Sequence, residues 1–423
     1  MARAFETGGI LVAAALAALF AGCRSSDWPD GVRESGTAFA RDALAPYVER
    51  GEIAGGVSVF YDDGRQETCC IGYADREAKR PITVDDPFMQ CSQTKGFCGV
   101  TVAMLIEEGR VSLDDPVSKY LPEFATLWVR EGETNGVRTL RQAKNALTIR
   151  MVMNHTGGFP FELPAKQPEI PGGGWSGGMP LRSVAAEAAA HPLDFEPGTR
   201  SQYSNTGIDI GAAVVEAVSG MKWEDFLKRR VLDPLGMRAT CFRPTDEMIA
   251  RKIEMYEVVP GRPARHMEQC GWEQRPYNGS HVFASAGAGL WTTVRDQYRF
   301  YKMLMNLGVG DNGVRILKAE TVKRYLANST RLPGLPPNDL PGYSLGLKAA
   351  VHGGEDEWFG HGGAFGTNCM VNWQKRRLKL WAVQLRGAPR PWDKDREAAA
   401  ERFFGARLEG ADAASVTGRC GPG

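Results

Sequence analysis

The sequence predicts an α+β or α/β fold, in which an antiparallel sheet is flanked by helices and a helical domain is inserted between its halves. One observation is a two-strand pattern early in the chain, at Gly55 to Asp75. Another is a hairpin pattern near the other end, at Cys369 to Leu385. The third is the block of helix and loop patterns between them, at about residues 111–279. Strands, then helices, then strands suit one sheet completed by distant segments, and 423 residues suffice for such a core.

The first residues have a pattern typical of export. Ile10 to Ala21 is an apolar run with the length of a signal-peptide core, too short to span a bilayer. Small residues then lead into Cys23, which resembles a bacterial lipobox whose cysteine carries the lipid. We expect a lipoprotein signal peptide at residues 1–22, a tether at 23–36, and a lipid anchor on Cys23 in the periplasm or cell envelope. The alternative is an ordinary signal peptide with an incidental cysteine.

One domain is expected at residues 37–408, with α/β parts at about 37–110 and 280–408. Thr37 to Arg50 has apolar residues at helical spacing. The strands within Gly55 to Asp75 are joined by an Asp-Gly turn at Asp63-Gly64. Thr94 to Glu108 is apolar on nearly every face and ends at Gly109. A helix without a polar face belongs inside the protein, so we expect it at the centre.

The rest of the chain alternates helix, loop and strand patterns. The predicted helices are Leu147 to Met153, Ile208 to Val218, Trp223 to Val231, Val294 to Leu307 and Asp393 to Leu408. The predicted loops are Ser112 to Phe124 and Pro171 to Gly178, and the predicted strands are Gly287 to Thr293 and Gly342 to Ala350. The tail, Glu409 to Gly423, is small and polar, and disorder is expected there.

Charge and metal-ligand spacing exclude some function classes. The formal net charge is +1, which gives no basic face for nucleic acid. The nine cysteines include no CxxC pair, and the six histidines include no HExxH motif. We therefore expect no metal or other cofactor, and a metallohydrolase is disfavoured. No disulfide is required by the sequence.

The stretch QCSQTKGF, Gln90 to Phe97, holds the first candidate for chemistry. Ser92 and Lys95 are three positions apart at the start of the most apolar helix, so they share a face. A buried lysine loses its charge more easily and can act as a base for the serine. The alternative is that Ser92 is only an N-cap. A capping box would then place Glu or Gln where Lys95 stands, and a cation there is locally unfavourable.

The same spacing recurs at Ser219 and Lys222, so the motif alone does not decide. Ser219 precedes Gly220 at the end of an apolar helix, and we expect it to be a cap residue, with Lys222 in solvent.

Two further motifs complete a candidate site. Tyr203 and Asn205 project to one side of an extended segment, as a proton relay and a hydrogen-bonding amide, or else form a turn and cap. His361-Gly362-Gly363 joins a titratable donor to glycines that allow close backbone approach, or else is a turn with a surface histidine. His155, beside a Gly-Gly turn, is expected to be structural and is left out of the site.

Together, Ser92-x-x-Lys95, Tyr203-x-Asn205 and His361-Gly362-Gly363 resemble, in order, the motifs of the beta-lactamase family of serine hydrolases. The sequence around these motifs, from roughly Ala38 to Leu385, also resembles members of this family. The resemblance implies a beta-lactamase/transpeptidase-like fold and an acyl-enzyme on Ser92, with Lys95 and Tyr203 sharing the proton transfers. It also implies that Asn205 and His361-Gly362-Gly363 bind substrate, and that the backbone N–H groups of Ser92 and Ala364 form the oxyanion hole.

The third motif departs from the family pattern, which usually begins Lys-Thr-Gly. A histidine is a weaker, conditional cation, so an ester, amide or D-amino-acid peptide is favoured over a beta-lactam as the small-molecule or peptide substrate. No Glu-x-x-Leu-Asn stretch follows Tyr203-x-Asn205, and Cys91 and Gln93 are unusual for the family. The alternatives are a true beta-lactamase and a penicillin-binding-like envelope protein with little turnover. The oligomeric state is left open.

Overall fold

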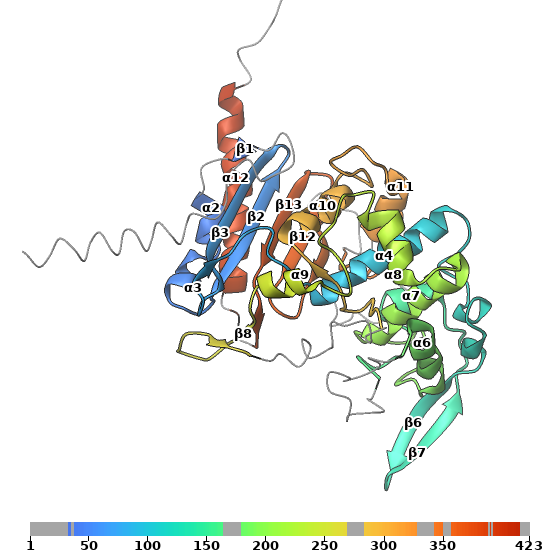
Figure 1. The fold of residues 1–423 in the computed structure, drawn as a ribbon. Coiled ribbons are helices and arrows are strands. Elements are labelled where there is room, and N and C mark those ends of the chain that lie inside the picture. The colour runs from blue at the N-terminus through green and yellow to red at the C-terminus, as the bar shows by residue number, and fades with distance from the viewer. Residues whose placement is uncertain are drawn as a thin grey trace, which may run out of the picture.

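The structure is a computed structural model that describes residues 33–34, 38–163, 179–268, 283–327, 342–349, 357–387, 390 and 392–414. Its centre is a seven-stranded sheet in the order β1-β3-β2-β13-β12-β11, with β4 paired to β3 (Figure 1). The pairing is antiparallel except between β1 and β3. The strands are β1 (Arg33–Glu34), β2 (Gly55–Asp62), β3 (Arg65–Asp75), β4 (Arg80–Pro81), β11 (Phe359–Gly362), β12 (Asn368–Asn372) and β13 (Arg377–Ala382).

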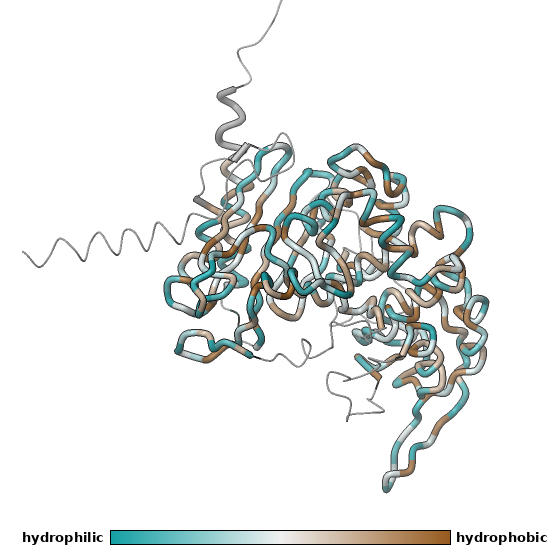
Figure 2. The backbone as a smooth tube through the Cα atoms, viewed as in Figure 1, coloured by the Kyte–Doolittle hydropathy of each residue, from teal (hydrophilic) through white to brown (hydrophobic). Residues whose placement is uncertain are grey.

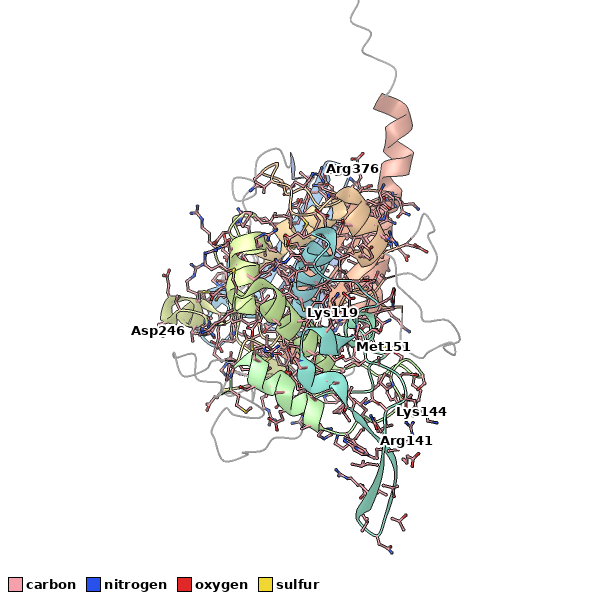
Figure 3. All side chains as sticks on the ribbon, turned by 90° about the vertical axis from the view of Figure 1, so that its right-hand side faces the viewer. Lys119, Arg141, Lys144, Met151, Asp246 and Arg376 are labelled. Carbon is pink, nitrogen blue, oxygen red and sulfur yellow. The ribbon has the colours of Figure 1, made fainter. Side chains whose placement is uncertain are left out.

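Two distant segments complete this sheet, because β2 pairs directly with β13. Both predicted hairpins are confirmed: Asp63 and Gly64 form the β2–β3 turn with positive φ, and β12 and β13 turn near Arg376, which Figure 3 labels. The predicted fold class is therefore confirmed.

Helices cover both faces of the sheet, and successive residues of a strand point to opposite faces. Phe60 and Trp381 pack into the core beneath α2, α3 and α12. Val59 and Leu380 pack into the larger core on the opposite face, which includes α4 and α10. The helices are α2 (Ala38–Asp42), α3 (Ala45–Glu49), α4 (Thr94–Glu107), α10 (Val294–Met305) and α12 (Trp392–Ala414).

The middle of the chain packs beside the sheet around α4 (Figure 1). Its helices are α5 (Ile149–Met153), α6 (Leu181–Ala190), α7 (Asn205–Ser219), α8 (Trp223–Leu227) and α9 (Asp246–Arg251), with a π-helical turn at Lys228–Leu232. After α10 come α11 (Ala319–Thr321) and a second π-helical turn at Val322–Leu326. Short 3-10 turns lie at Cys91–Gln93, Val117–Lys119 and Pro122–Ala125. The prediction of a central apolar helix is confirmed, because α4 is buried from Thr94 to Leu105 and ends before Gly109, whose φ is +70°.

Small strand pairs join the segments around the site. The remaining short strands are β5 (Phe88–Met89), β8 (Tyr256–Glu257), β9 (Arg265–His266), β10 (Trp291–Thr292) and β14 (Leu385–Arg386). Strand β5 pairs with β10, which ties the segment before Ser92 to the segment before α10.

The middle of the chain also contains a hairpin, which the prediction of a helical, loop-rich middle did not include. Strands β6 (Trp128–Thr134) and β7 (Val137–Gln142) project from the body, with Arg141 near the base (Figures 1 and 3). Figure 2 shows mostly hydrophilic residues toward its tip. Ion pairs such as Arg138–Glu133 link the strands. The largely exposed strands carry no alternation of apolar residues. The turn signal was present, however, because Asn135-Gly136, with positive φ at both residues, is a dipeptide that favours a two-residue hairpin turn.

Several element boundaries also differ from the predictions. The helix predicted from Thr37 to Arg50 is two helices, because Pro46 lacks an N–H and restarts the helix at Ala45. The strand predicted at Gly342 to Ala350 is reduced to isolated bridges, one of them between Lys348 and Gly360. Of the tail predicted to be disordered, residues 409–414 continue α12.

Several predictions concern residues outside the described ranges, namely the signal peptide, Cys23, most of the tether, the Pro171 to Gly178 loop and the end of the tail. No helix among the described residues has the length and hydropathy needed to cross a membrane. Cys70 is disulfide-bonded, which the sequence did not indicate.

Candidate active site

Ser92 lies in the 3-10 turn Cys91–Gln93, directly before α4. The N-cap of α4 is Gln93, whose side chain makes no capping hydrogen bond, so the alternative that Ser92 is only the N-cap of this helix is excluded. Cys91 has a φ of +50°, a left-handed conformation that is unfavourable for any residue with a Cβ. The chain therefore makes a strained bend immediately before Ser92, and Ser92 stays half-buried at the positive end of α4.

A hydrogen bond to the Gln93 side chain links this turn to α10. Gln297 Nε2 donates to Gln93 Oε1 at 2.7 Å and to Gln90 Oε1 at 3.4 Å, and all three side chains are fully buried. Buried polar groups that are hydrogen-bonded to each other fix one arrangement of the segments that carry them. This network gives Gln93 a physical role that the family resemblance left unexplained.

Lys95 is fully buried one turn after Ser92. Its Nζ lies 3.2 Å from Ser92 Oγ, 2.5 Å from Asn205 Oδ1 and 2.7 Å from the carbonyl oxygen of Gly287. Burial lowers the pKa of Lys95 from 10.5 to about 7, against the smaller opposing effect of carboxylates such as Asp209. A substantial fraction of Lys95 is therefore a neutral amine near neutral pH.

Tyr203 lies beside Lys95, with its ring centroid 4.6 Å from Nζ. Burial raises the pKa of Tyr203 well above its usual value of 10, and a hydrogen bond with the Ser92 side chain only partly offsets this. The phenol is therefore protonated at neutral pH, when it can relay a proton but cannot act as the initial base.

Asn205 begins α7, where Ser204 caps the helix by accepting a hydrogen bond from the Gly207 N–H. The side chain of Asn205 is buried, and both ends of its amide have protein partners. Oδ1 accepts from Lys95 Nζ, and Nδ2 donates to Glu162 Oε1 at 2.9 Å. Asn205 thereby orients the lysine; its predicted contact with substrate stays a prediction.

His361 lies on β11, 3.5 Å by its Nε2 from the Tyr203 hydroxyl. Its Nδ1 lies 2.6 Å from the Gly362 carbonyl oxygen, so Nδ1 carries the proton, because a carbonyl can only accept. Burial, and next the Lys95 charge, hold the pKa of His361 well below 6.5. The prediction that His361 is a conditional cation at neutral pH was wrong; it is a neutral acceptor facing Tyr203.

Gly363, directly after β11, lets the chain approach the turn that bears Ser92. A Cβ on Gly363 would lie 2.5 Å from the Gln90 carbonyl oxygen and 2.1 Å from Thr367 Oγ1, whereas one on Gly362 would meet nothing within 3.4 Å. Ala364 follows on the exposed rim, and its carbonyl accepts a hydrogen bond from Arg390. The role of the Ser92 and Ala364 N–H groups as an oxyanion hole stays a prediction.

The structure thus brings Ser92, Lys95, Tyr203, Asn205 and His361 together from three distant parts of the chain. The second S-x-x-K match is elsewhere: Ser219 ends α7, and Lys222 is exposed, as expected.

Three other residues contact this group and were missing from the predicted site. Glu162 holds Asn205, and Gly287 offers its carbonyl to Lys95. His155 is structural, as expected, but it packs against Tyr203 with ring centroids 4.5 Å apart and accepts a hydrogen bond from the Ser204 N–H. The glycine-rich sequence around Gly287 was the signal that could have indicated a close approach of the backbone at this position.

A cavity of about 440 Å³ opens onto Ser92. Tyr203, His361, Gly362 and Gly363 line it beside the serine. Its other walls are Tyr343, Lys348, Gly366, Thr367, Asn368, Trp381, Arg390, Asp393, Arg396 and Glu397. Among the described residues, no group of three or more His, Cys, Asp or Glu side chains is placed to hold a metal ion.

The family model for beta-lactamase matches residues 40–402 of the chain. Protein Rv1367c of Mycobacterium tuberculosis is 30% identical over 259 residues, 60% of this chain and 62% of that protein. The lovastatin esterase of Penicillium rubens is 28% identical over 239 residues, 55% of this chain and 58% of the esterase. The chain thus spans less than two thirds of the length of these relatives.

Solved structures share the fold. A variant of simvastatin synthase (LovD) from Aspergillus terreus superposes with a TM-score of 0.70 at 22% identity, over 89% of this chain and all of the other. The match of the family model to most of the sequence, together with this fold, shows that the chain belongs to the beta-lactamase family of serine hydrolases.

Proposed function

We propose that this protein is an exported serine hydrolase that cleaves an ester, an amide or a D-amino-acid peptide through an acyl-enzyme on Ser92. The observation that carries the proposal is the distance of 3.2 Å between Lys95 Nζ and Ser92 Oγ. Because burial lowers the pKa of Lys95 to about 7, about half of this lysine is a neutral amine at that pH.

The partners of Lys95 support its role as the base. A neutral amine has two N–H donors and one lone pair. Asn205 Oδ1 and the Gly287 carbonyl can only accept, so they use both donors. The lone pair is left for the third neighbour, the Ser92 hydroxyl, which is the geometry needed to remove its proton.

The reaction then follows from these positions. Ser92 Oγ attacks the substrate carbonyl carbon while its proton passes to Lys95, and the negative charge on the carbonyl oxygen is met by the Ser92 and Ala364 N–H groups. The bond to the leaving alcohol or amine breaks as Tyr203 gives it a proton, which Lys95 replaces. Water then attacks the acyl-enzyme by the reverse route, and the acid and free Ser92 are released.

The neutral His361 and the relatives favour an ester over a beta-lactam. Because His361 is neutral, the third motif itself gives a lactam carboxylate no charge partner, and any cation that binds a carboxylate has to come from another part of the cavity. A relative is named as lovastatin esterase, and another, from Burkholderia gladioli, as Esterase EstB. A true beta-lactamase and a penicillin-binding-like protein remain as outcomes of the test below.

The test compares wild type with Ser92→Ala on p-nitrophenyl esters, D-amino-acid amides and nitrocefin. We expect ester hydrolysis by wild type and its loss in Ser92→Ala, with labelling by a fluorophosphonate lost in parallel. Labelling that persists in Ser92→Ala would refute the nucleophile. Nitrocefin turnover faster than ester turnover would instead identify a beta-lactamase, and stable acylation by a penicillin probe without turnover would identify a binding protein.

Export and the lipid anchor are a separate part of the proposal, supported by the apolar run Ile10 to Ala21 and the following Cys23. The full chain, expressed in a bacterium with an alkyne fatty acid, should incorporate the lipid label and sediment with membranes. Cys23→Ser should do neither. Equal labelling of both forms would refute the anchor.

A further inference from the structure

Lys348 lies at the wall of the catalytic cavity, and its ammonium group has no ion pair with any described residue. Its backbone pairs with Gly360 on the outer edge of β11, through hydrogen bonds of 2.8 and 3.0 Å in the two directions. The residue lines the same cavity as Ser92 and His361. Its position is therefore fixed by the strand that also carries the third motif.

No carboxylate of the described residues forms an ion pair with Lys348. Burial lowers the pKa of Lys348, with no opposing effect from an acid among the described residues. A half-buried cation without a counter-charge is costly in the empty protein. That cost is removed when an anion occupies the cavity.

The acids that line the cavity are already paired. Asp393 binds Arg396, and Glu397 binds Lys379, a residue outside the cavity wall. Arg390 also lines the wall and, unlike Arg396, has no ion pair with a carboxylate of the described residues; it donates to the backbone carbonyls of Ala364 and Leu385. Lys348 and Arg390 thus leave the cavity with an excess of positive charge.

The histidine of the third motif cannot supply this charge, because His361 is neutral and the Lys348 charge itself lowers its pKa further. We propose that the cavity selects substrates that carry a carboxylate near the scissile acyl group, and that Lys348 binds this carboxylate. This inference rests on the proposed hydrolase function and names its substrate class. The cation comes from the segment beside β11 rather than from the third motif itself.

The test uses two pairs of esters that differ only in a carboxylate. One pair places it on the leaving group: 4-acetoxybenzoate against its methyl ester. The other places it on the acyl group: mono-4-nitrophenyl adipate against 4-nitrophenyl hexanoate. The quantity measured is kcat/KM for the anionic ester divided by kcat/KM for the neutral ester, which cancels changes common to both.

For at least one pair, Lys348→Met should lower this ratio about 10- to 100-fold, the range for a hydrogen bond to a charged group. Lys348→Arg should keep most of the ratio, because the charge is retained. Lys222→Met, at an exposed lysine outside the cavity, should leave it unchanged. Raising the salt concentration should lower the wild-type ratio. An unchanged ratio for both pairs in Lys348→Met would overturn the inference.

A second measurement needs no variant, in case Lys348→Met does not fold. With wild type and a neutral ester, 4-methoxybenzoate should inhibit competitively at about tenfold lower concentration than 4-methoxybenzamide. Equal inhibition by the two would also overturn the inference. Failure of the proposed function looks different: no ester of the four would then be hydrolysed in a manner that depends on Ser92.

Discussion

Asn205 Oδ1 lies 2.5 Å from Lys95 Nζ, although the two residues are 110 positions apart in the chain. The contact joins the start of α7 to the start of α4, and Glu162 fixes the amide from its other end. The lysine is thus held by acceptors while burial removes its charge. The predictions below follow from this arrangement.

The pH dependence should report Lys95. The base form is the neutral amine, so kcat/KM for a p-nitrophenyl ester should rise with pH, with a midpoint at about 7, and then level off. Initial rates of wild type across neutral pH, corrected for the Ser92→Ala background, measure this midpoint. A midpoint in the range of ordinary lysines would contradict a buried, neutral base.

Glu162→Gln should move that midpoint to lower pH. The Glu162 carboxylate favours the charged form of Lys95 and so raises its pKa. The isosteric amide removes this influence but still offers an oxygen to Asn205 Nδ2. Glu49→Gln, at an exposed residue of α3, is the matched control and should leave the profile in place. A shift to higher pH would show that the sign of this interaction is wrong.

Gly287→Ala should lower kcat/KM strongly. The added Cβ would lie 2.7 Å from Asn205 Cβ, so the backbone that faces Lys95 has to move. A displacement of about 1 Å in an active site costs roughly 100-fold. Gly132→Ala is the control, because a Cβ there meets no atom within 4 Å and its φ is ordinary. Equal activity of the two variants would refute the role of Gly287.

His155→Phe should destabilise the protein by about 1–3 kcal/mol, the cost of leaving a buried donor unpaired. The phenyl ring can still pack against Tyr203, but it cannot accept the hydrogen bond from the Ser204 N–H. Urea unfolding monitored by tryptophan fluorescence measures the loss. His191→Phe, at the end of α6, should cost less, and an equal cost would contradict the stated cause.

Much of the fold followed from local patterns. The Asp63-Gly64 turn requires positive φ, and Gly109 ends a helix in the left-handed conformation, so both could be predicted from the residues alone. The β6–β7 hairpin was not predicted, because its largely exposed strands carry no alternation of apolar residues, although Asn135-Gly136 marks its turn in the sequence. Pro46 indicated the break between α2 and α3, but the helical spacing of the apolar residues led to the prediction of one continuous helix.

The sequence by itself determined the candidate residues Ser92, Lys95, Tyr203 and His361, because their spacing and order carry chemical meaning. Only the tertiary structure decided their charge states and partners. Burial makes Lys95 partly neutral, keeps Tyr203 protonated and keeps His361 neutral. The approach of Gly287 to Lys95, and the position of Lys348 without a carboxylate partner among the described residues, likewise arise where distant segments pack together.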